Sequence, residues 1–133
     1  MECKFAFICD YAERDRKLHA IGIGWNALYA QTLPTMHPMM CFVAVVRGTI
    51  AEVGTKSVSV RLIDADGEDV IPPLQHQVSF EVKAPLLEGD IQLVMNLVNL
   101  QFKKYGPYAI HLVVQGHEMA SVSFNVSEPP TTA

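Results

Sequence analysis

The stretch that decides the fold runs from Tyr108 to Val126 and reads YAIHLVVQGHEMASVSFNV. Large apolar residues alternate with small or polar ones on both sides of a glycine. The apolar positions are Tyr108, Ile110, Leu112 and Val114 before the glycine, and Ala120, Val122, Phe124 and Val126 after it. Apolar residues at period two around a glycine turn predict two antiparallel strands with one buried face. The chain is therefore predicted to be all-β, and this hairpin carries no recognisable chemistry.

The same alternation predicts how the two strands are connected. Directly opposed residues of an antiparallel pair lie on one face, so the two apolar sets must meet across the ladder. A two-residue loop, Gly116–His117, would oppose Leu112 to the polar Ser121. A three-residue loop, Gly116–Glu118, opposes Leu112 to Val122 instead, and such loops commonly contain a bulge. We therefore predict a bulged turn with an exposed tip.

Further short alternations along the chain indicate more strands. The clearest lie at 3–9, 18–30, 56–64 and 76–83, and a polar segment at 10–17 is expected to connect the first two. Segment 40–47 is nearly all apolar and is expected to be a central strand. Segment 91–102 is ambiguous, because its polar residues Gln92, Asn96 and Asn99 recur at helical spacing, although its neighbours favour a strand. About eight strands joined by short turns predict a two-sheet antiparallel β-sandwich. We expect one domain over 1–126 and a flexible tail over 127–133.

The approach to the hairpin narrows the type of sandwich. Residues 100–108 read LQFKKYGPY and resemble the tyrosine corner of immunoglobulin-like domains. In that corner a tyrosine hydroxyl donates a hydrogen bond to a backbone carbonyl a few residues upstream. The pattern favours an immunoglobulin-like Greek key over a jelly roll or a closed barrel.

Composition excludes some classes of function. The 133 residues include ten basic and fourteen acidic side chains, and only 18% are charged. The chain has no basic stripe of the kind that nucleic-acid-binding proteins carry. Its longest apolar run, 39–46, is far shorter than the roughly 20 residues of a membrane helix. A β-domain with few charges is expected to hide surface against a second copy or another protein, so we predict a homo-oligomer or a protein partner, and neither nucleic acid nor membrane.

The cysteines and the N-terminus indicate the compartment. Cys3 and Cys9 lie about 20 Å apart on one predicted strand, too far to form a disulfide. With Cys41 they make an odd number, which favours free thiols in a reducing cytoplasm. The first ten residues carry charges at Glu2, Lys4 and Asp10 and do not resemble a secretory signal. We expect a soluble cytoplasmic protein.

A family resemblance covers nearly the whole chain. The segments FAFICDYAERDRKLHAIGIGWNALYA, LPTMHP, LIDADGEDV and YGPYAIHLVVQGHEMASVSFNV are similar to a family of small bacterial proteins of unknown function. The most specific parts are Cys9–Ala12 and Gly22–Trp25. The resemblance implies a stand-alone β-sandwich and assigns no activity.

The spacing of cysteine, histidine and acidic residues in the sequence does not indicate a catalytic or metal-binding site. Cys9 has an adjacent carboxylate, Asp10, which opposes thiolate formation. The acidic run Asp64–Asp69 lacks the spacing of a calcium loop and suits a turn. The five histidines have no partners at metal-binding spacing. We therefore predict neither an enzyme nor a cofactor.

One group of residues is worth testing as a binding site. Trp25, Asn26, Tyr29 and His37 fall close together around a proline-bounded loop and could line a recognition surface. The alternative is that Trp25 continues the face of Ile21 and Ile23 into the core, as large aromatics commonly do. The leading functional hypothesis is a non-enzymatic interaction or assembly module that self-associates. The rival is a domain that binds a small ligand or carbohydrate through Trp25, Tyr29 and His37.

Overall fold

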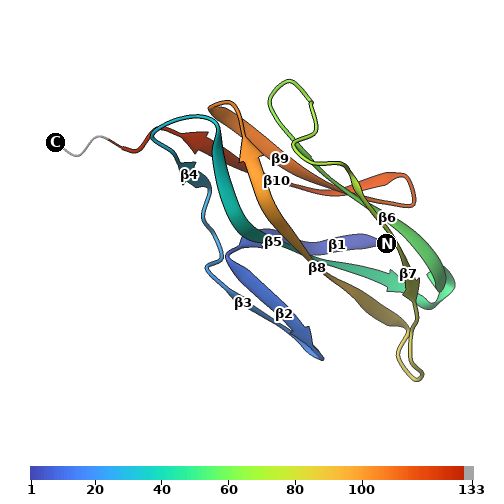
Figure 1. Cartoon of the computed structure of the whole chain (residues 1–133). Coiled ribbons are helices and arrows are strands. Elements are labelled where there is room, and N and C mark those ends of the chain that lie inside the picture. Colours follow the sequence, from blue (N-terminus) through green and yellow to red (C-terminus); the bar gives the residue numbers. More distant parts are fainter. Residues whose placement is uncertain (131–133) are drawn as a thin grey trace.

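The structure of the protein is a computed structural model, which describes residues 1–130. It is all-β, as predicted, but has ten strands instead of about eight (Figure 1). The strands are β1 (Glu2–Cys9), β2 (Tyr11–Asp15), β3 (Lys17–Ile21), β4 (Ala27–Tyr29), β5 (Thr35–Thr49), β6 (Gly54–Ile63), β7 (Leu74–Phe80), β8 (Glu88–Phe102), β9 (Gly106–Val114) and β10 (His117–Ser127), with one 3₁₀ turn, η1 (Ile50–Glu52). Within the described residues, no helix is long and apolar enough to cross a membrane.

The strands form two sheets and a separate hairpin. One sheet has the order β1-β5-β8, and the other has the order β4-β10-β9-β6-β7. All pairs are antiparallel except β4 with β10. Figure 1 shows β5 and β8 as long curved strands that cross the molecule together, with the β2–β3 hairpin projecting below them. One face of the three-stranded sheet is therefore turned toward the five-stranded sheet, and the other toward the β2–β3 hairpin.

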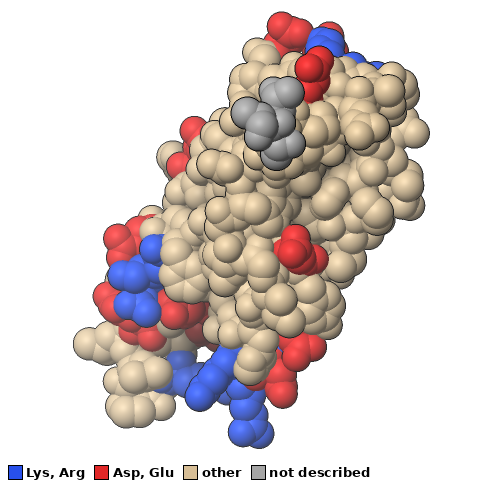
Figure 2. Space-filling model, turned by 90° about the vertical axis from the view of Figure 1, so that its left-hand side faces the viewer, with Lys and Arg blue, Asp and Glu red and all other residues tan. Residues whose placement is uncertain are grey.

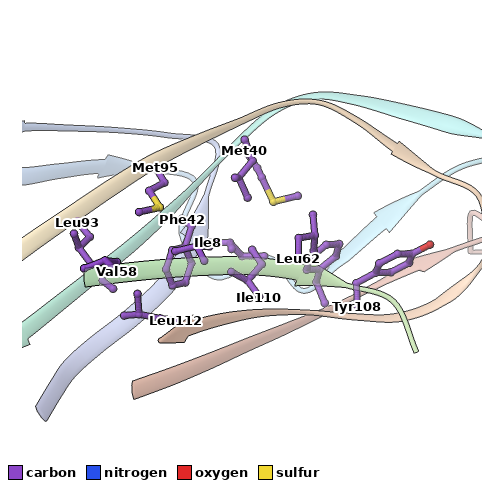
Figure 3. Packing of buried hydrophobic residues seen from close by; sticks show 14 of the residues in the cluster. Ile8, Met40, Phe42, Val58, Leu62, Leu93, Met95, Tyr108, Ile110 and Leu112 are labelled. Atoms are coloured by element: carbon purple, nitrogen blue, oxygen red, sulfur yellow. The ribbon is translucent and has the colours of Figure 1, made fainter. Parts of the chain in front are cut away.

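The main core lies between the two sheets (Figure 3). Strand β5 turns Met40, Phe42, Ala44 and Val46 toward it, and β9 supplies Tyr108, Ile110, Leu112 and Val114 from the opposite sheet. The period-two pattern on which the fold prediction rested is thus the pattern of burial. Full burial of each such large apolar side chain contributes roughly 1.5–3 kcal/mol of hydrophobic stabilisation.

The other face of the three-stranded sheet is covered by the β2–β3 hairpin. Cys9, Cys41 and Val43 are buried there beneath Ala12 of β2. The polar segment expected as a connection over 10–17 is therefore a strand and a tight turn, and that prediction was wrong. The turn residue Arg16 has a positive φ of 58°. Strand β2 buries one small residue, Ala12, and its other side chains are exposed. The alternation of buried and exposed positions is therefore hard to recognise among the charged residues of the sequence.

Segment 91–102 is a strand, as its neighbours suggested, and a left-handed residue at Asn99 explains its helical spacing. Gln92 and Asn96 face away from the main core, whereas Leu97 is buried in it. Asn99 adopts a left-handed conformation with a φ of 52°, after which Leu100 is again buried. The alternation of buried residues therefore shifts by one position at Asn99, while the register with β5 is unchanged because Pro38 is skipped opposite Asn99. The polar positions fall out of period two and imitate a helix.

The last hairpin confirms part of its prediction. Its two apolar sets share one face, and a bulge is present between Glu118 and Ala120. The predicted three-residue turn and the pairing of Leu112 with Val122 were wrong, because Leu112 faces Ala120 and Val122 faces Ile110. The bulge lies inside β10 and not in the turn.

A different turn explains this register. Val114 pairs with His117, so the two loop residues are Gln115 and Gly116, and both have positive φ values, 50° and 79°. The Gln115 side chain is held by Ser57 on β6, whose backbone N–H and hydroxyl donate to Oε1 at 2.7 and 2.9 Å. A non-glycine residue seldom takes this conformation unless such contacts offset its cost.

The tyrosine hydrogen bond and the end of the chain complete the fold. The Tyr108 hydroxyl donates to the carbonyl of Lys104 at 2.8 Å, as the sequence pattern predicted. Ser127, placed by the sequence in the tail, still belongs to β10. Residues 131–133 of the expected tail lie outside the described residues.

Candidate functional site

An irregularity shared by β5 and β8 brings His37 and Trp25 together. Pro38 and Asn99 lie between the pairs Met39–Val98 and His37–Leu100, so β5 changes the direction of its side chains at the same point as β8. The His37 ring consequently meets Trp25, with 6.0 Å between the ring centroids. The contact between Trp25 and His37 thus depends on an irregularity that the sequence alone does not indicate.

Trp25 is part of the main core, where it joins an aromatic cluster. Its ring packs edge-on against Phe124 of β10, with 5.8 Å between centroids. Phe102 and Tyr108 surround the other sides of Phe124, at 5.8 and 5.7 Å. Edge-to-face pairs at these distances are favourable beyond the apolar area that they bury. The packing interpretation of Trp25 therefore has direct support, although Ile21 and Ile23, expected on the same face, are exposed.

Two nitrogen atoms of this cluster lack hydrogen-bond partners. The indole Nε1 of Trp25 and the imidazole Nε2 of His37 are both buried and unpaired. Burial lowers the pKa of His37, an effect opposed by a hydrogen bond with the backbone of Met39 and by the charge of Asp10. The neutral imidazole is the form that this environment favours. The site thus holds a titratable group whose charge the fold disfavours.

This arrangement predicts a pH dependence of stability. Because the pKa of His37 is lower in the folded chain than its ordinary value of about 6.5, the unfolded chain takes up the proton first as the pH falls. The free energy of unfolding should decrease as the pH falls below about 6.5. Urea unfolding at a series of pH values should show a smaller decrease for His37→Gln than for the natural chain. His117→Gln, at the exposed first residue of β10, is the matched control, and an equal change in both variants would contradict the assignment.

The other two predicted site residues lie elsewhere. The Asn26 side chain is exposed, and its backbone carbonyl accepts a hydrogen bond from the Asn125 N–H at 2.8 Å. Tyr29 pairs with Ser127 at the edge of the five-stranded sheet and is exposed, whereas its neighbour Leu28 packs on the core. The structure therefore brings Trp25 and His37 together but not Asn26 or Tyr29. Ligand binding by this group stays a prediction.

Cys9 is placed as a packing residue. It lies directly opposite Cys41 across β1 and β5, and both side chains are fully buried. Burial, together with the neighbouring Cys41 and Asp10, raises the pKa of Cys9 to about 11. At neutral pH the group is a thiol, which is a poor nucleophile.

The acidic run forms a turn, as predicted. The Asp64 carboxylate accepts hydrogen bonds from the backbone N–H groups of Asp66 and Glu68, at 2.9 and 3.0 Å. These bonds, the one from Glu68 foremost, lower the pKa of Asp64. Lys104 pairs with Asp66 at 2.8 Å and so neutralises part of the cluster. Among the described residues, no group of three or more His, Cys, Asp or Glu side chains is arranged to hold a metal ion.

The surface carries apolar side chains in regions without charge. Residues 18–46 and 91–102 contain no Lys, Arg, Asp or Glu. Five large apolar residues from these two stretches are more than half exposed: Ile21 (69%), Ile23 (56%), Tyr29 (59%), Met36 (54%) and Val98 (53%). We call these five side chains the uncharged surface, after the stretches of sequence that carry them. The nearby carboxylate of Asp10 comes from outside these stretches and lies against Gly22, between Ile21 and Ile23. Figure 2 faces the side of the molecule where β4 and the segment before it lie. A broad uncharged area runs through its middle, with charged groups at the top, along the left edge and at the bottom, and an acidic group at the right of the middle.

Comparison with known proteins gives a family and no activity. Residues 4–127 match a family of unknown function, DUF6941. No curated protein matches the chain. One similar solved structure is the Pseudomonas fluorescens alkylpurine DNA glycosylase AlkC bound to DNA containing an abasic site analog, with 11% identity and a TM-score of 0.46. The match covers 77% of this chain but only 28% of that one, and a likeness this low carries no argument about function.

Proposed function

This chain belongs to that family of unknown function, and we propose that it is a non-enzymatic interaction module that associates with a second copy of itself. The observation that carries the proposal is the uncharged surface. A soluble domain normally surrounds exposed apolar side chains with charged ones, because contiguous apolar surface promotes association. Here five such side chains come from stretches of 29 and 12 residues that lack any charge.

The absence of charge also favours a particular kind of partner. Charged patches select partners of opposite sign, whereas an uncharged surface has no electrostatic preference of that kind. A second copy presents the same uncharged side chains, and a two-fold arrangement places the same patch on both sides of the contact. Two copies of the chain are therefore complementary to each other, and the proposed association requires no other protein.

Light scattering coupled to size exclusion tests the proposal. We expect the mass of two chains at high protein concentration and a shift toward one chain on dilution. Because the contact is apolar, added salt should leave the association unchanged or strengthen it. A mass of one chain at every concentration would rule out self-association.

Two finer assignments accompany this proposal. An immunoglobulin-like Greek key is supported by the hydrogen bond from the Tyr108 hydroxyl to the Lys104 carbonyl. A cytoplasmic location is supported by the free thiols of Cys3, Cys9 and Cys41.

A further inference from the structure

Strand β8 has one free edge, and a single contact shows which backbone groups point toward it. The guanidinium of Arg14 donates to the carbonyl oxygen of Gln92 at 2.9 Å, so this carbonyl points away from β5. In an antiparallel pair, the residues whose backbone groups point to one side alternate. The register with β5 is unbroken from Glu88 to Val98. Val94, Asn96 and Val98 therefore direct their N–H and C=O groups to the free edge, together with Gln92.

This free edge is bounded on both sides. Arg14 occupies the carbonyl of Gln92 at one end, and the left-handed residue Asn99 ends the regular strand at the other. Between them lie residues 93–98, which carry no charge. Asn96 and Val98 are exposed, and none of the hydrogen bonds found among residues 1–130 uses the outward backbone groups of Val94, Asn96 or Val98.

Natural edge strands are usually protected against pairing with another chain. Short length, lysines, prolines and bulges are the common protections. The edge strand β4 is three residues long, and β1 carries Glu2 and Lys4 with an irregular register between Cys3 and Phe5. The edge strand β7 approaches β8 itself. The segment 93–98 has none of these protections within its own length.

We propose that two copies of the chain pair along this edge, antiparallel, with Asn96 opposite Asn96 of the partner subunit. This inference rests on the proposed self-association and names its site. The register places Val94 opposite Val98 of the partner subunit, so each of the three outward residues meets an outward residue. It leaves Gln92, already occupied by Arg14, outside the hydrogen-bonded ladder. The two three-stranded sheets then become one continuous sheet across the two-fold axis.

A second copy suits this edge better than an unrelated strand. The free segment is centred near Asn96, so a two-fold axis at that residue pairs it with itself and no group is left over. The side chains that would meet are an amide with an amide and a valine with a valine, which are compatible cross-strand pairs. The Asn96 Oδ1 already accepts a hydrogen bond from the Cys41 thiol at 3.0 Å, so the amide NH₂ is the group that faces the partner subunit.

Charge substitution at Asn96 tests this pairing. Asn96→Lys and Asn96→Glu each place two like charges directly opposite each other in the dimer, which is unfavourable. Each variant alone should dimerise roughly tenfold more weakly or worse than the natural chain. An equal mixture of the two should recover dimers, because opposite charges then face each other. Gln75→Lys and Gln75→Glu change an exposed amide on β7, in the other sheet and outside the uncharged stretches, and should dimerise normally.

The outcomes of this experiment distinguish a failure of the pairing along β8 from a failure of self-association. A natural chain that never dimerises overturns the proposed function, and the inference with it. A natural chain that dimerises while both Asn96 variants do so equally well overturns the edge alone. If each single variant dimerises weakly and their mixture does not recover dimers, the placement of Asn96 opposite Asn96 of the partner subunit is overturned. Circular dichroism of each variant, matching that of the natural chain, confirms that the substitutions act on association and not on folding.

Discussion

Replacing Phe124 by alanine should lower the free energy of unfolding by about 3–5 kcal/mol. The ring is 1% exposed and is the hub of the aromatic cluster, in contact with Trp25, Phe102 and Tyr108. Removing it takes away the burial of a large apolar group and leaves a cavity between rings that are held on three different elements. Rings anchored in this way cannot collapse fully into the space, which places the cost at the upper end of the usual range.

The same substitution at Phe5 provides the control. Phe5 is 49% exposed and stacks on Phe7 at the outer side of the three-stranded sheet. We expect Phe5→Ala to cost less than about 1 kcal/mol, as surface substitutions usually do. Urea unfolding followed by circular dichroism measures both variants. Equal losses in the two would contradict the assignment of Phe124 as the centre of the core.

The period-two pattern was sufficient to predict the strands that line the core. Strands β6, β9 and β10 bury the residues that alternate in the sequence, whereas β5 is nearly all apolar and is buried on both faces. It was sufficient because each strand has one face toward the same core, so the pattern of hydrophobic residues and the pattern of burial coincide. The hydrogen bond of Tyr108 was predicted for a similar reason, since a local sequence motif defines a local contact.

Features that depend on contacts distant in sequence were not predicted. The turn at Gln115 is held by Ser57, which lies on another strand, and the residue by itself gives no signal of a left-handed conformation. The left-handed residue Asn99, opposite Pro38, changes the direction of side chains and so made a strand resemble a helix. The β2–β3 hairpin buries only small residues, and its charged neighbours concealed the alternation. In each case a tertiary contact sets the local geometry.

The candidate site was predicted only in part for the same reason. Trp25 and His37 meet because β5 and β8 are irregular at the same place, whereas Tyr29 follows the regular alternation of β4 to the outside. The free edge of β8 had a signal in the sequence, namely the absence of charge over 91–102. That signal identifies an edge only once the strand order is known.

The pairing along β8 should protect three backbone amides from hydrogen exchange. The N–H groups of Val94, Asn96 and Val98 point away from β5, so a single chain leaves them open to water, and a second copy would bond them. Those of Leu93 and Leu97 bond to β5 in either state. Amides in a hydrogen-bonded ladder exchange far more slowly than amides that face solvent, because exchange then requires the ladder to open.

Residue-resolved hydrogen exchange by nuclear magnetic resonance, above and below the dimerisation concentration, is the most direct test of association through this edge. The account predicts that the amides of Val94, Asn96 and Val98 exchange slowly in the dimer and quickly in the dilute monomer, while those of Leu93 and Leu97 stay slow in both. Fast exchange of Val94, Asn96 and Val98 in a sample that is fully dimeric would contradict it.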